Sequence, residues 1–257
     1  MRSFGQTVGL FTIEPDGGEQ VEVGAGGGYL AAWSPDASQL AYLHSGNAGR
    51  NDLFVINSDG TNKRRLTNTP EEEGIPAWSP TGETIAVSIP IDGDAEIFLI
   101  NADSGEVVVQ LTDNEGVDDY MPAWSPDGNQ IAYVSQSEVG GSDEIHIMAA
   151  DGTTSIRITD NEVGDYYPAW APNGDTIAYV SARVGEQTLF LMDVDGSNQR
   201  QLTDGQDRDS RPAWSPDGSV IAYHSYIDDT WSLELIDVAT GTVTFLVQDG
   251  VHPAWSR

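Results

Sequence analysis

The sequence predicts an all-β fold, a six-bladed β-propeller built from four-stranded antiparallel blades. The first observation is a tryptophan that recurs at spacings of 45, 46, 46, 44 and 41 residues along the 257-residue chain. Repeats of this length are typical of four-stranded propeller blades. The second observation is that each repeat contains turn motifs and alternating apolar runs but no helical periodicity. The six tryptophans are Trp33, Trp78, Trp124, Trp170, Trp214 and Trp255.

Each repeat begins with a strand that ends at the tryptophan. The motif is Pro-Ala-Trp in five copies and Ala-Ala-Trp at Trp33. Proline cannot donate a hydrogen bond to a neighbouring strand, so it favours a strand with a free edge, as the innermost strand of a blade has. We expect the tryptophan to pack between neighbouring blades, where a large flat side chain buries the most area.

The rest of each repeat predicts three more strands. A tight turn such as "SPDG" (125–128) follows the tryptophan, because Pro presets φ and Gly accepts a positive φ. Alternating runs such as "NQIAYVS" (129–135) and "DEIHIMAA" (143–150) predict the second and third strands. An Asp-Gly or Thr-Gly turn then leads to a fourth strand that ends in Leu-Thr or Ile-Thr.

The two ends of the chain predict one blade shared between them. Residues 4–17 align with residues 183–196 on a shared Asp-Gly, and the C-terminal "HPAWSR" carries an inner-strand motif. We therefore expect a single domain over 1–257 whose sixth blade is shared between 255–257 and 1–32, which closes the ring. About seven residues of that blade's second strand have no counterpart. Either the closing blade is incomplete or the native chain is longer.

The charge excludes several classes of partner. The chain has 41 acidic and 11 basic residues, with Lys63 as its one lysine, and a net charge of −30. Such a charge repels nucleic acids and anionic membranes. No apolar run approaches the roughly 20 residues that span a bilayer, and the absence of cysteine excludes disulfides. A halophilic, periplasmic or extracellular setting and an ordinary solvated acidic surface both remain open.

The repeat resembles a known family. The pattern "PAWSPDGxxIAY", with "LTD" before it and Asp-Gly between the outer strands, is similar to the TolB-type (WD40-like, PD40) propeller repeat. The resemblance covers essentially the whole chain. It implies a propeller that binds something, often another protein, in an exported setting. The N-terminal α/β domain of that family's namesake has no counterpart here, and neither does a serine-hydrolase domain. The family's partner-binding residues lie outside the repeat motif, so the resemblance assigns none.

Acidic residues recur five positions before the tryptophans, at Glu73, Asp119, Asp165 and Asp209. In the loops around one mouth of the channel, they would form a ring of hard oxygen ligands suited to Ca²⁺. The alternative is that each carboxylate accepts backbone N–H groups within its own loop.

The next two positions vary from repeat to repeat and carry aromatic and basic side chains. Such side chains on loops of a rigid scaffold predict a site that stacks on and hydrogen-bonds a peptide or a sugar. Ordinary packing of the loops against the neighbouring blade is the alternative. The candidate binding residues are Tyr29, Tyr120, Tyr166, Tyr167, Arg211 and His252.

No catalytic motif stands out in the sequence, which lacks a nucleophile elbow, an H-E-x-x-H motif and a P-loop. The favoured interpretation is a non-enzymatic binding or assembly scaffold that presents its channel mouth to a protein or peptide. Self-association by strand addition at the closing blade is a variant. The alternative is a metal-dependent lyase or hydrolase that acts on a carbohydrate at the channel mouth. An engineered propeller without a native task is a third interpretation.

Overall fold

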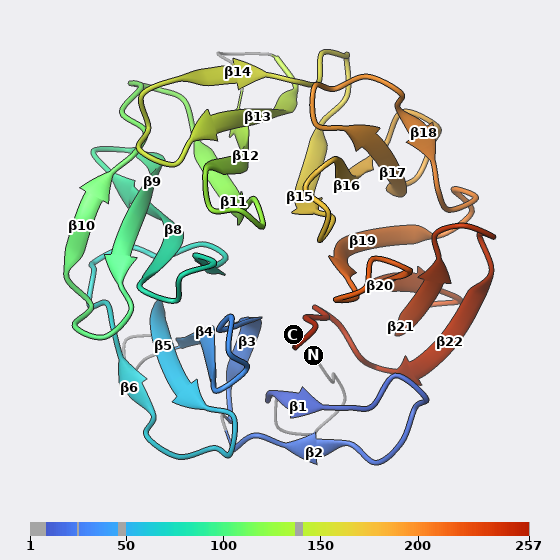
Figure 1. Ribbon diagram of the computed structural model, residues 1–257, viewed down its shortest axis with the longest axis horizontal. Coiled ribbons are helices and arrows are strands. Elements are labelled where there is room, and N and C mark those ends of the chain that lie inside the picture. Colours follow the sequence, from blue (N-terminus) through green and yellow to red (C-terminus); the bar gives the residue numbers. More distant parts are fainter. Residues whose placement is uncertain (1–8, 25, 46–49, 137–140, 257) are drawn as a thin grey trace.

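The computed structural model describes residues 9–24, 26–45, 50–136 and 141–256. Five four-stranded antiparallel sheets, the blades, stand around one central axis, with the first strand of each blade innermost (Figure 1). Within these described ranges, no helix is long and apolar enough to cross a membrane.

The blades follow one another along the chain, each with its strands in sequence order from the axis outward. The first two blades consist of β3 (Gly28–Trp33), β4 (Gln39–Ser45), β5 (Asn51–Asn57) and β6 (Arg64–Arg65), then β7 (Ala77–Trp78), β8 (Thr84–Ile91), β9 (Asp94–Asn101) and β10 (Val107–Gln110). The third and fourth consist of β11 (Asp119–Trp124), β12 (Gln130–Gln136), β13 (Asp143–Ala149) and β14 (Ser155–Arg157), then β15 (Asp165–Trp170), β16 (Thr176–Ser181), β17 (Thr188–Asp193) and β18 (Arg200–Gln201). The fifth consists of β19 (Arg208–Trp214), β20 (Val220–Ile227), β21 (Thr230–Asp237) and β22 (Val243–Gln248).

The prediction of six four-stranded blades is wrong, because the described residues form five. Only a two-stranded sheet, β1 (Phe11–Thr12) with β2 (Val21–Glu22), occupies the remaining segment of the ring (Figure 1). In every blade a second strand of six to eight residues follows the tryptophan and pairs with the inner strand. After Trp255 only Ser256 is described. Residues 253–256 form no strand and pair with no described strand, so the predicted closure by a C-terminal inner strand is also wrong.

The β1–β2 sheet nevertheless stands where the outer half of a blade would be. The N–H of Val23 donates to the carbonyl of Leu10 (2.9 Å), as that of Leu66 donates to Leu53 (2.8 Å) in the first blade. Leu10 and Val23 pack against Tyr42 and its neighbours in that blade. Leu10 thus accepts the same hydrogen bond as Leu189, its counterpart in the sequence alignment, although the blade around it is incomplete.

The apolar core consists of clusters between consecutive blades. Between the first and second blades, Leu53 and Val55 pack with Trp78, Ile85 and their neighbours. Similar clusters join the second to the third blade, the third to the fourth and the fourth to the fifth. Each sheet has two apolar faces, and each face is buried only by a neighbouring blade, as in other repeat architectures.

The predicted position of the tryptophans between blades is confirmed. The indole N–H of a tryptophan donates to the carbonyl of the alanine that precedes the tryptophan of the preceding repeat. These bonds measure 3.0–3.1 Å and join Trp78 to Ala32, Trp170 to Ala123, Trp214 to Ala169 and Trp255 to Ala213. Trp255 thus makes the interblade contact although residues 253–256 form no strand.

A second interblade contact lies at the turn between the two outer strands. Gly105 has φ +75° and its Cα faces the Leu66 carbonyl so closely that a Cβ would collide with this oxygen. Gly241 occupies the same position in the fifth blade, with φ +71° and the same turn hydrogen bond, but a Cβ there would have no atom within 4 Å. A comparison of alanine substitutions at the two glycines therefore separates the cost of the left-handed backbone from the cost of the interblade collision.

We expect Gly105→Ala to lower the free energy of unfolding by about 3 kcal/mol, the sum of left-handed strain and overpacking. Gly241→Ala should lower it by only about 1 kcal/mol, since only the strain applies. Urea unfolding of both variants measures the difference. Equal losses would show that the blades do not press together at this turn.

Candidate functional site

The inner strands carry a β-bulge that turns one side chain toward the axis. In β3, β11, β15 and β19 the pairing with the next strand skips two residues just before the Ala-Trp pair. The first skipped residue has a left-handed backbone, which non-glycine residues rarely adopt. These residues, with the matching one near the C-terminus, are Leu30, Met121, Tyr167, Arg211 and His252, with φ between 54° and 60°.

All five left-handed residues line one pocket at the axis, together with Ile75 and the prolines that follow them. The pocket has a volume of about 130 Å³, and its remaining lining consists of Ala31, Pro122, Pro168, Pro212 and Pro253. The prolines lie on the free edge of the inner strands, as their missing N–H predicts. We call this set the axial pocket. Its lining is apolar apart from the side chains of Tyr167, Arg211 and His252.

The sequence-predicted binding residues separate into two groups. Tyr167, Arg211 and His252 line the axial pocket. Tyr29, Tyr120 and Tyr166 lie one position earlier, outside that lining. Tyr166 donates to the Asp143 carboxylate (2.6 Å) in the preceding blade. Burial and Asp143 raise the pKa of Tyr120, and burial followed by the Glu72 charge raises the pKa of Tyr29.

Sequence reasoning missed the apolar part of the axial pocket. Leu30, Ile75 and Met121 occupy the same repeat position as Tyr167 and Arg211, so their spacing was visible in the sequence. Their apolar character suggested packing, and no glycine or asparagine marked the left-handed backbone.

Tyr167, Arg211 and His252 form the polar part of the pocket, and the buried His224 packs against His252. The Arg211 guanidinium carbon lies 4.6 Å from the ring centre of Tyr167. The rings of His252 and His224 lie 5.3 Å apart, and the His252 backbone N–H donates to Nδ1 of His224 (3.2 Å). Burial, followed by the Arg211 charge, lowers the pKa of His224 to about 3 and that of His252 to about 2. Both imidazoles are therefore neutral at pH 7, and Arg211 is the cation of the site.

The four predicted acidic residues are buried where neighbouring blades meet. Exposure is 3% for Glu73, 1% for Asp119, 0% for Asp165 and 3% for Asp209. Glu73 accepts from the Thr69 hydroxyl (2.7 Å), and Asp209 accepts from the Ser225 hydroxyl (2.7 Å). No group of three or more His, Asp or Glu side chains in the described part of the chain is placed to hold a metal ion. Calcium binding by this ring stays a prediction.

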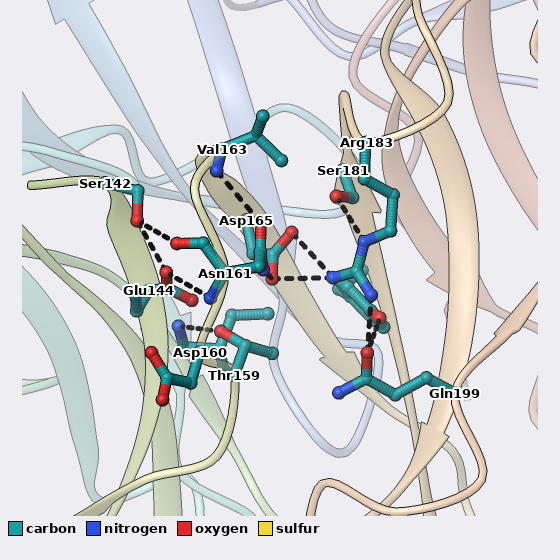
Figure 2. A network of polar contacts seen from close by, with 12 residues as sticks. Ser142, Glu144, Thr159, Asp160, Asn161, Val163, Asp165, Ser181, Arg183 and Gln199 are labelled. Atoms are coloured by element: carbon teal, nitrogen blue, oxygen red, sulfur yellow. Dashed lines mark hydrogen bonds and ion pairs between the residues drawn. The ribbon is translucent and has the colours of Figure 1, made fainter.

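The interface between the third and fourth blades shows how such a carboxylate is satisfied. Figure 2 shows Asp165 between Asn161 and Arg183, which donate to it at 2.7 and 2.8 Å. A second buried carboxylate, Glu144, accepts from the Ser142 hydroxyl (2.6 Å) and pairs with Arg157 (3.0 Å). Two buried acids at one interface are thus each matched by an arginine.

Asp119 and Asp209 form no ion pair with any described arginine. Burial, opposed by the Ser135 hydroxyl and increased by the Glu96 charge, raises the pKa of Asp119 to about 6. Burial likewise raises the pKa of Asp209 to about 6, against hydrogen bonds from Thr203 and Ser225. Desolvation disfavours the ionised carboxylate, and a neighbouring negative charge adds to that effect.

A comparison with known families identifies the repeat. The sequence matches the family described as PD40, the TolB beta propeller domain, over residues 10–257. The chain belongs to this family. The match agrees with the blade period, the interblade tryptophans and the all-β architecture.

Individual relatives of this TolB-family propeller are similar over short stretches. An uncharacterized peptidase, YuxL, from Bacillus subtilis is 34% identical over 64 residues, which is 25% of this chain and 10% of that protein. The Tol-Pal system protein TolB from Alcanivorax borkumensis is 31% identical over 61 residues, 24% of this chain and 14% of that protein. The matched stretches thus span a small fraction of both curated relatives.

Solved structures extend the likeness of the fold to most of the chain. TolB from Acinetobacter baumannii superposes with a TM-score of 0.85 and 21% identity over 96% of this chain and 62% of that one. An oligogalacturonate lyase in complex with manganese superposes with a TM-score of 0.63 and 14% identity over 94% of this chain and 73% of that one. At these identities the likeness shows the fold alone.

We expect Asp119→Asn to stabilise the protein by about 2 kcal/mol at pH 7.5. The folded-state pKa of Asp119, about 6, lies above its unfolded value. The free energy of unfolding that the protonated Asp119 contributes is therefore fully present below pH 4 and is lost as the pH rises through 6. An asparagine cannot ionise, so the variant does not lose it. Urea unfolding at pH 4 and pH 7.5 measures the difference, which should vanish at pH 4.

Asp165→Asn is the matched control, because it changes the same repeat position in the next blade. It leaves the partly buried Arg183 without its counter-charge, so we expect a loss on the order of 3 kcal/mol at pH 7.5. A destabilising effect of Asp119→Asn at pH 7.5, or one independent of pH, would contradict the raised pKa.

Proposed function

We propose that this propeller is a non-enzymatic binding module that receives a segment of a protein or peptide partner at the axial pocket. The observation that carries the proposal is the set of left-handed residues at one repeat position. Their backbone conformation recurs, while the side chain is leucine, methionine, tyrosine, arginine or histidine. The repeat thus keeps the backbone conformation at this position constant and varies the side chain that lines the pocket.

The backbone strain supports a binding role. A left-handed conformation costs a non-glycine residue roughly 1–2 kcal/mol, and glycine would remove that cost. Strained residues persist where the surrounding structure holds them, and they gather at binding and active sites. Five of the twelve described non-glycine residues with a left-handed backbone surround one pocket of about 130 Å³, and in four of them a bulge turns the side chain toward the axis.

The family adds support of a different kind. One relative is named Tol-Pal system protein TolB, so its name gives it as a component of a system. This name favours a protein partner for the chain. A periplasmic or extracellular location is part of the proposal and fits the acidic composition. The carbohydrate-lyase alternative draws support from the superposition on oligogalacturonate lyase, but that likeness is one of fold.

Selection of peptides from a random displayed library on the immobilised protein tests the binding role. We expect enriched peptides to bind with micromolar affinity and to lose about 30-fold on Met121→Ala or Tyr167→Ala, the loss typical of a central contact residue. Ile156→Ala, an exposed change on the outer strand β14, is the control and should leave affinity unchanged. Peptides that bind equally to all three variants would overturn the proposal.

Self-association through the sixth segment is a second proposal. The β1–β2 sheet pairs at only two residue positions, and it exposes Phe11 and Val21 at 42% and 57%. A second copy of the chain could cover these side chains by strand addition. Because each copy carries a charge of −30, association should strengthen as salt screens their repulsion.

Sedimentation velocity over a concentration series in low and high salt tests self-association. We expect a dimer that grows with concentration and salt, and that Val21→Lys abolishes. Ile156→Lys adds the same charge on another exposed edge and should leave the dimer intact. A monomer under all conditions would rule the dimer out.

A further inference from the structure

The axial pocket contains a charge that the described protein does not neutralise. Arg64, Arg65, Arg157, Arg183 and Arg208 each form an ion pair with a carboxylate. Arg50, Arg200 and Arg211 form none with any described residue, although the chain has 41 acidic residues for 11 basic ones. Arg50 and Arg200 are exposed to solvent, whereas Arg211 is partly buried at the axis, so solvent screens the charge of Arg211 least.

The nearest acidic residue along the strand is turned away. Asp209 lies two positions before Arg211, but it is 3% exposed and accepts from the Ser225 hydroxyl. The bulge between Ser210 and Ala213 turns Arg211 out of the alternation that Asp209 follows. One carboxylate is therefore placed between blades while the guanidinium is placed at the axis.

The geometry points to a carboxylate site: we infer that Arg211 binds the side-chain carboxylate of an aspartate or glutamate that a partner inserts into the axial pocket. This inference rests on the proposed binding function and names the chemistry read there. The Tyr167 ring centre lies 4.6 Å from the guanidinium carbon. A guanidinium has five N–H donors, so a pair remains for a carboxylate beside any contact with Tyr167.

The surroundings favour a carboxylate over a phosphate. Arg211 is the single cation among the described lining residues, because both histidines are neutral at pH 7. One guanidinium matches one negative charge, whereas a phosphate dianion would retain a charge that the −30 protein repels. Leu30, Ile75 and Met121 provide apolar contacts for the aliphatic stem that carries the carboxylate.

The size of the pocket favours a side chain over a chain terminus. Its 130 Å³ equals the volume of about four water molecules. A carboxyethyl or carboxymethyl group fits this volume. A C-terminal residue would bring its own side chain and a peptide group beside the carboxylate.

Titration with N-acetylglutamate methylamide, followed by the NMR signals of the arginine side chains, tests the site. We expect the Arg211 Nε–H signal to shift and saturate at millimolar probe. N-acetylglutamine methylamide, which has the same shape without the charge, should bind at least tenfold more weakly. Arg211→Gln should weaken glutamate-probe binding at least tenfold, followed through the Tyr167 and His252 signals. Arg200→Gln removes an exposed arginine from β18 and should change nothing.

If thermal melting shows that Arg211→Gln does not fold, Arg211→Lys is the second variant for the same titration. Lysine keeps the charge but loses the paired contact, so we expect a weakening of several-fold. Equal binding of the glutamate and glutamine probes, or binding unaffected by both Arg211 variants, would overturn the inference. Tighter binding of N-acetylalanine, whose carboxylate is a chain terminus, would overturn the assignment to a side chain.

The two proposals can fail separately. Selected peptides that depend on Met121 and Tyr167 but contain no essential acidic residue would leave the binding function standing and remove the carboxylate site. Saturable binding of the glutamate probe without any selected peptide would support the carboxylate site and count against a protein partner.

Discussion

The contact between each tryptophan and the preceding blade determines the rest of this structure. No blade can bury its two apolar faces alone, so every blade depends on its neighbours. The indole fills the space between two sheets, and its N–H ties the blade to the inner strand before it at 3.0–3.1 Å. The tryptophan ends the inner strand, and the axial residue lies three positions before it. Docking the tryptophan therefore also places a side chain at the axis.

Two of the six repeat tryptophans, Trp33 and Trp124, make no such bond among the described residues, and Trp124 shows why. Trp124 has a buried indole N–H with no acceptor among the described atoms. The matching carbonyl belongs to the second blade, whose inner strand β7 is reduced to Ala77–Trp78. That blade carries Gly74 and Ile75 where other repeats have a bulge, and Ile75 is absent from the left-handed residues described. Where the inner strand departs from the pattern, both the indole bond and the axial bulge are lost together.

Much of the fold was predictable because interblade packing selects the same residues in every repeat. The period, the strand order and the position of the tryptophans follow from this. The number of blades did not follow, because the period counts tryptophans rather than strands. Trp255 docks on Ala213 as its counterparts do, yet a blade also needs a second strand to pair with the inner one. The repeat therefore indicates the interface reliably and the completeness of a blade only indirectly.

The site was less predictable, since its key features depend on contacts far apart in the chain. The position of Tyr167 and Arg211 in the repeat identified them as candidates, but regular alternation cannot show that a bulge turns them, and not Tyr166, toward the axis. The acidic residues looked like one ring around the channel mouth. Their partners lie in other segments of the chain, as Arg183 in the turn after β16 does for Asp165 and Ser225 in β20 does for Asp209. The structure therefore places each acid in its own buried site.

Two kinds of energetically unfavourable group, the buried carboxylates and the axial residues, thus differ in the partners that the fold provides. Hydroxyls, amides or arginines of the fold itself hydrogen-bond to or pair with the buried carboxylates between blades. Where no arginine pairs with the carboxylate, as at Asp119 and Asp209, burial raises its pKa. At the axis, left-handed residues and the Arg211 charge have no compensation within the described residues. Such departures from the repeat's own pattern are expected at functional sites, which is the physical reason for the binding role proposed above. Because the tryptophan contacts hold the ring independently of the axis, the axial residues can vary from repeat to repeat without loss of the architecture.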